Sequence, residues 1–142
     1  MKFSDFIGKG QAKQALPDTS LAKSLIATAE NDLKFLSSLP INNNSARKLM
    51  SNYYDILRSI LEAIAALDGY KIYSHEAFTF FLKEKKGEGM IAEKFDRFRK
   101  IRNGINYYGK NISPEETMEN AAEMTKLIAL LKKKYLSGTG KA

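Results

Sequence analysis

The stretch SNYYDILRSILEAIAAL, residues 51–67, decides the fold. Apolar side chains recur along it every three or four residues and fill two neighbouring stripes: Leu49, Tyr53, Ile56, Ile60 and Leu67, and beside them Met50, Tyr54, Leu57, Leu61 and Ala65. The remaining polar face is narrow and consists of Ser51, Asp55, Arg58 and Glu62. A helix with so little polar surface is covered on most sides, so we expect it at the centre of an all-α protein.

Helical periodicity continues on both sides of this segment. It predicts further helices over 18–39, 75–86, 90–108 and 114–136, and no stretch alternates with period two for long. Gly69 suits the left-handed residue that ends the central helix. Ser74 is an N-cap candidate, and Ser113–Glu116 reads as a capping box with proline at the first helical position. In the last two helices the patterns place Tyr108 and Met118 on the inward face.

Four long helices and one short helix, joined by short loops, predict an antiparallel up-and-down helical bundle. A chain of 142 residues suits one domain, so we expect a single domain over 1–142. Residues 1–17 form an N-terminal arm in this prediction, with Phe3, Phe6 and Ile7 as a possible docking turn. Residues 137–142 are expected to be a flexible tail, although Gly138–Lys141 resembles the end of a phosphate-binding loop.

The composition excludes several kinds of site. The chain has no cysteine, which rules out disulfides and thiolate chemistry, and one histidine, which disfavours a histidine-based metal site. We expect no metal and no cofactor. His75 follows an N-cap serine, where a capping or packing role is the simplest interpretation. Without a signal peptide or a membrane-length apolar run, a cytoplasmic protein with no membrane contact is expected.

Positive charge is concentrated in residues 94–110. The chain carries a net charge of +7, and this segment holds six basic residues and one acidic residue, a net +5. Five polar side chains share one face of the predicted helix, opposite its apolar stripe: Arg99, Arg102, Asn103, Asn106 and Tyr107. Guanidinium, amide and phenol groups together suit phosphate and base recognition. The alternative is a solvated basic face that meets the acidic start of the last helix, which includes Glu123.

The order of these elements resembles the HEPN superfamily of small helical bundles, found in prokaryotic toxin–antitoxin pairs and beside nucleotidyltransferases. The resemblance covers about residues 18–136 and rests on SNYYDILRSILEAIAAL, SHEAF, RNGINYYG and the capped last helix. In catalytic members an arginine is followed, after four to six residues, by a histidine. The arginine corresponds to Arg102, followed by Asn103, and the histidine positions hold Tyr107, Tyr108 and Gly109. The motif histidine is therefore missing.

The resemblance implies three alternative functions. The first is an RNA- or nucleotide-binding protein with impaired ribonuclease activity, in which Arg102 still binds phosphate. The second is an interaction module that docks a minimal nucleotidyltransferase. The third is an active metal-independent endoribonuclease, with Arg102 and either Tyr107 or the distant His75 as catalytic residues. A phenol with an ordinary pKa near 10 is a poor base at neutral pH.

The resemblance also implies an assembly and a modification. Family members form two-fold homodimers whose motif residues meet in a shared cleft, so Arg102 is expected to line such a cleft. Some members carry a tyrosine near the motif that the partner nucleotidyltransferase modifies with AMP, and Tyr108 is the candidate here. Two copies of a basic segment repel one another, so apolar packing or bound anions must offset that repulsion.

Overall fold

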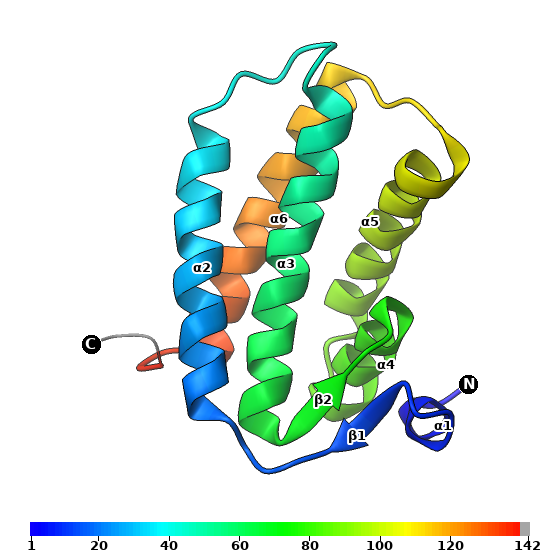
Figure 1. The fold of residues 1–142 in the computed structure, drawn as a ribbon, viewed down its shortest axis with the longest axis vertical. Helices are drawn as coiled ribbons and strands as arrows, with labels where there is room; N and C mark the ends of the chain where they lie inside the picture. The colour runs from blue at the N-terminus through cyan, green and yellow to red at the C-terminus, as the bar shows by residue number, and fades with distance from the viewer. Residues whose placement is uncertain (140–142) are drawn as a thin grey trace.

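A computed structural model describes residues 1–139, which form six helices and two short strands (Figure 1). In chain order the elements are α1 (Phe3–Gly8), β1 (Ala12–Gln14), α2 (Thr19–Ser37), α3 (Ala46–Asp68), β2 (Tyr70–Ile72), α4 (His75–Lys85), α5 (Gly89–Tyr108) and α6 (Pro114–Tyr135). The predicted all-α bundle is confirmed. Within residues 1–139 no helix combines the length and apolar character needed to cross a membrane.

The central position predicted for α3 is also confirmed. This helix packs along α2 on one side, against α6 behind it, and against α5 on the other side (Figure 1). Its fully buried side chains include Tyr54, Leu57, Ile60 and Leu61. On α2 the buried stripe consists of Ala22, Ile26, Ala29 and Leu36.

Helix ends follow the local chemistry of the sequence. Asp18 caps α2 by accepting a hydrogen bond from the Leu21 amide at 2.9 Å, and the Ser113 hydroxyl accepts one from the Glu116 amide at 3.1 Å. Gly69 and Gly109 end α3 and α5 at φ of +82° and +66°. At Gly69 a Cβ atom would stand 2.8 Å from the Ala15 carbonyl oxygen, so no larger residue fits there.

Two side chains predicted to face inward are exposed. Tyr108 is 77% exposed and Met118 is 49% exposed, so both predictions are wrong. The last turn of α5 and the first turns of α6 lie at one end of the bundle and are joined by the loop of residues 109–113 (Figure 1). Neighbouring helices cover less of each turn there, and the helical period alone does not reveal this.

The N-terminal arm docks onto the bundle, as the predicted docking turn requires. Phe3 and Phe6 of α1 are buried. Strands β1 and β2, which the sequence analysis missed, pair antiparallel with Ala12 opposite Ile72. The Gln11 carbonyl then accepts hydrogen bonds from the amides of Tyr73 and Ser74, which lead into α4. The predicted tail, residues 137–142, lies partly outside the described residues.

Candidate anion-binding site

Three arginines from two facing helices surround the buried ring of Tyr54. Arg58 lies on α3, one turn from Tyr54, and Arg99 and Arg102 lie on α5. The Arg102 guanidinium carbon stands 5.6 Å from the centre of the Tyr54 ring. Because α3 and α5 run antiparallel, residues far apart in sequence converge at this level of the bundle. We call Arg58, Arg99 and Arg102 the arginine cluster.

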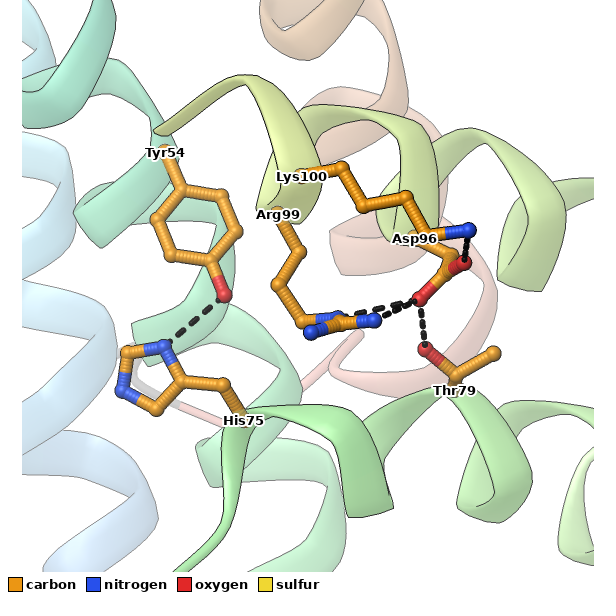
Figure 2. Close-up of polar contacts among 6 residues, drawn as sticks. All are labelled: Tyr54, His75, Thr79, Asp96, Arg99 and Lys100. Carbon is orange, nitrogen blue, oxygen red and sulfur yellow. Dashed lines mark hydrogen bonds and ion pairs between the residues drawn. The ribbon is translucent and has the colours of Figure 1, made fainter. Parts of the chain in front are cut away.

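The single histidine of the chain also reaches this place. Tyr54 stacks on Phe95 with ring centres 5.4 Å apart, and its hydroxyl lies 2.9 Å from Nδ1 of His75, the first residue of α4 (Figure 2). In the same view the Arg99 side chain lies between this pair and Asp96. The sequence predicted a capping or packing role for His75, and a catalytic role only in the endoribonuclease alternative. The packing role is confirmed, but its partner is Tyr54 of the central helix.

The electrostatics keep both members of the pair uncharged. Burial, together with the charges of Arg58, Arg102 and Arg99, lowers the pKa of His75 to about 4. Burial raises the pKa of Tyr54 well above its ordinary value, although the same arginines oppose that change. At neutral pH the site therefore combines a neutral imidazole–phenol pair with several guanidinium charges.

Most of the basic side chains in residues 94–110 have acidic partners. Asp96 accepts from Arg99 at 2.7 and 2.9 Å and from Lys100 at 3.1 Å (Figure 2). Glu123 of α6 pairs with Arg97 at 2.7 Å and with Lys94 at 3.9 Å. This is the contact with the acidic start of the last helix that the sequence left open. The unneutralised charge of the segment is therefore smaller than its net +5.

Arg102 differs from these four residues. Among residues 1–139 it has no acidic partner, and its Nη1 donates only long hydrogen bonds, to Asn103 Oδ1 at 3.4 Å and Tyr107 Oη at 3.3 Å. Its Nε is buried without an acceptor in the described chain. Arg58 also has a buried Nε without a described acceptor, although its Nη1 lies 3.4 Å from Glu62. Unpaired buried donors are costly, and on Arg102 the weakly bonded Nη1 is the group that can donate to an anion.

The predicted site residues fall into two groups. Arg102, Asn103 and Tyr107 lie together, and the Tyr107 ring, 67% exposed, has its centre 5.6 Å from the Arg102 guanidinium. Asn106 instead accepts a hydrogen bond from the Ser51 hydroxyl of α3 at 3.0 Å, and Arg99 is held by Asp96. The exposure of Tyr108 leaves this tyrosine accessible to a modifying enzyme.

Sequence reasoning missed Arg58 and Tyr54 as members of the site, and it named His75 only as a distant catalytic alternative. One signal was present, because Arg58 is the single basic residue on the narrow polar face of the central helix. Within the described part of the chain, no three His, Cys, Asp or Glu side chains gather closely enough to hold a metal ion. The arrangement suits binding of phosphate groups by guanidinium groups, with an exposed aromatic ring beside them.

Comparison of the chain with family models, with curated proteins and with solved structures found no match.

Proposed function

We propose that the chain is a HEPN-like RNA-binding protein of the cytoplasm that holds phosphate groups at the arginine cluster. One observation carries the proposal: Arg102 has no acidic partner in the described chain, and its Nη1 donates only two long hydrogen bonds. A phosphate oxygen can accept from such donors, and guanidinium groups match phosphate geometry. A free nucleotide offers the same group and is the smaller ligand of the same class.

The surroundings of Arg102 favour single-stranded RNA over an isolated phosphate ion. The exposed ring of Tyr107 lies against the Arg102 guanidinium. Single-stranded RNA presents unstacked bases, and an aromatic ring beside a phosphate contact gives a base a surface on which to stack. Double-stranded RNA offers no such base, so the strand that binds should be single.

A second candidate function is slow, metal-independent cleavage of the bound RNA, and the position of His75 favours it. The neutral imidazole can take the proton of a ribose 2′-hydroxyl as that oxygen attacks phosphorus. The bond to the 5′-oxygen then breaks, and the leaving oxygen receives a proton from the imidazolium. Arg102 would stabilise charge on the phosphate oxygens. Since the pKa of His75 is lowered to about 4, this base is weak and the reaction should be slow.

We further propose that the chain acts as a two-fold homodimer in a toxin–antitoxin or nucleotidyltransferase-associated system, with Arg102 lining a shared cleft. The ion pairs of Asp96 and Glu123 support this assembly, because they reduce the repulsion between two copies of α5. The alternative is an adaptor that docks a minimal nucleotidyltransferase, for which Tyr108 is the modification candidate. Light scattering at about twice 16.0 kDa would support the homodimer, and a monomer at micromolar concentration would refute it.

Fluorescence anisotropy with a labelled single-stranded RNA over a salt series tests the proposed binding. Phosphate contacts require that affinity fall as salt rises. Arg102→Ala should weaken binding about tenfold or more and flatten the salt dependence by about one ion. The matched control is Arg97→Ala, which removes the same charge from the same helix at a residue already paired with Glu123. Absence of binding at low salt, or equal loss in both variants, would overturn the proposal.

Incubation with total RNA separates the candidate functions. Cleavage that survives a chelator and is lost in His75→Gln supports the ribonuclease. Binding without cleavage supports the RNA-binding protein. Absence of both binding and cleavage, together with co-purification of a nucleotidyltransferase, supports the adaptor.

A further inference from the structure

A cleft between α3 and α5 lies one helical turn from the arginine cluster, and the function proposed above does not use it. Its volume is about 340 Å³, within the range of small-ligand sites. Asp55, which follows Tyr54 on α3, lines the cleft, and so does Asn106, one turn beyond Arg102 on α5. A group bound in the cleft therefore lies directly beside the proposed phosphate site.

The polar groups of the cleft offer a defined hydrogen-bonding pattern. The Ser51 hydroxyl donates to Asn106 Oδ1 at 3.0 Å, so the amide oxygen is occupied and the NH₂ group is left as a donor. Asn52 adds a second amide. The half-buried carboxylate of Asp55 makes no ion pair and no side-chain hydrogen bond with any residue from 1 to 139. It presents two acceptor oxygens that nothing in the described chain satisfies.

The position of Asp55 argues against a groove that binds phosphates alone. Arg47 and Lys48 line the same cleft on its far side, so the carboxylate lies between them and the arginine cluster. A carboxylate repels phosphate and weakens non-specific binding of a polyanion. It favours a ligand only where that ligand presents hydrogen-bond donors, and in RNA those donors lie on base edges.

We propose that this cleft, which we call the base cleft, binds a guanine base of single-stranded RNA; the inference rests on the proposed function, since the adjoining phosphate lies at the arginine cluster. The Watson–Crick edge of guanine presents two adjacent donors, N1–H and the 2-amino group, that match the two oxygens of a carboxylate. Adenine and cytosine place an acceptor ring nitrogen beside their amino group. Uracil offers a single N–H between two carbonyls. The Asn106 NH₂ suits the guanine O6 acceptor.

Fluorescence anisotropy with labelled seven-nucleotide RNAs tests the assignment. The RNAs are oligouridine with uridine, adenosine, guanosine or inosine at the central position. The guanosine oligomer should bind about tenfold more tightly than the uridine and adenosine oligomers, the size expected for one bidentate base contact. Inosine lacks the 2-amino group and should fall between them. Asp55→Asn should lower the affinity for the guanosine oligomer to that for oligouridine.

Asp32→Asn is the matched control. Asp32 lies on α2 and lines a separate cleft that Asp55 also borders, so its loss makes the same change of charge nearby without touching the base cleft. This variant should keep the guanosine preference, and circular dichroism should show both variants folded. If the wild-type chain binds all four oligomers equally, or if Asp55→Asn keeps the guanosine preference, the assignment of the base cleft to guanine is wrong and the proposed function stands. If no oligomer binds at low salt, both are wrong.

Discussion

The two parts of α5 both carry basic and aromatic side chains, but they differ in whether the basic side chains have acidic partners. From Gly89 to Lys100 every basic side chain has an acidic partner, either Asp96 within the helix or Glu123 on α6. From Ile101 to Tyr108 the single basic side chain, Arg102, has no acidic partner in the described chain. The first part uses charge to hold helices together, and the second part leaves charge available for a ligand.

The same contrast appears in the aromatic residues of the helix. Phe95 and Phe98 in the first part are fully buried, whereas Tyr107 and Tyr108 in the second part are 67% and 77% exposed. A count of charges or aromatic residues along α5 therefore does not locate the site. What locates it is the part of the helix where the ion pairs stop and the aromatic side chains become exposed, and that part begins at Arg102.

The largest expected effect contrasts two aromatic residues of α5. Phe95→Ala should lower the free energy of unfolding by about 3–5 kcal/mol, because it empties a buried position against Tyr54. Tyr107→Ala should lower it by less than about 0.5 kcal/mol, because the ring is exposed. Urea unfolding followed by circular dichroism measures both values. Similar losses in the two variants would show that the second part of α5 is also structural.

The next effect concerns pH and follows from the burial of His75 beside the arginine cluster. The pKa of His75 is about 4 in the folded chain and about 6.5 in the unfolded chain, so between these values only the unfolded chain binds the proton. Stability is therefore complete above pH 6.5 and falls as the pH drops toward 4. The loss should be no more than about 2 kcal/mol, because solvent screens a half-exposed ring.

His75→Gln isolates this contribution. The variant should lose less stability between pH 6.5 and 4.5 than the wild-type chain, in urea titrations at each pH. Asp96, whose pKa is also lowered, adds a loss in the same direction at lower pH and remains in both proteins. Identical pH profiles would mean that burial and the arginines do not lower the pKa of His75.

The smallest effect tests whether the ion pairs keep the basic side chains in the first part of α5 from binding phosphate. Glu123→Gln frees Arg97 and Lys94, and because both pairs are partly exposed to solvent the loss of stability should be below about 1 kcal/mol. RNA binding should become more sensitive to salt, since two more cations can meet phosphates. Glu119→Gln, which removes the same charge one turn earlier on α6, is the control. An unchanged salt dependence would show that the ion pairs with Glu123 do not keep Arg97 and Lys94 from binding RNA.

Sequence patterns predicted the helices because those patterns are local. Period-3.6 stripes, the Ser113 capping box and the glycine after α3 act within one or two turns, so element order and the central place of α3 followed from them. Strands β1 and β2 escaped prediction because three residues are too few to show a period.

The candidate site was predicted only in the part that lies on one helix. Arg102, Asn103 and Tyr107 share a face of α5, and helical spacing brings them together. Tyr54 and His75 meet through the packing of α4 against α3 and α5, which no local pattern encodes. The ion pair between Arg97 and Glu123 also depends on tertiary packing, so a charge sum along the segment overstated the free charge.

The N-terminal arm couples residues at the start of the chain to the position of His75. The Gln11 carbonyl holds the amides of Tyr73 and Ser74, and the Phe3 amide donates to the Glu84 carboxylate of α4 at 2.7 Å. In terms of hydrogen exchange, the arm and the start of α4 should behave as one opening unit. Each detachment of the arm would release the amides that precede His75, so the local opening equilibrium of the first fifteen residues sets how long the histidine stays beside Tyr54.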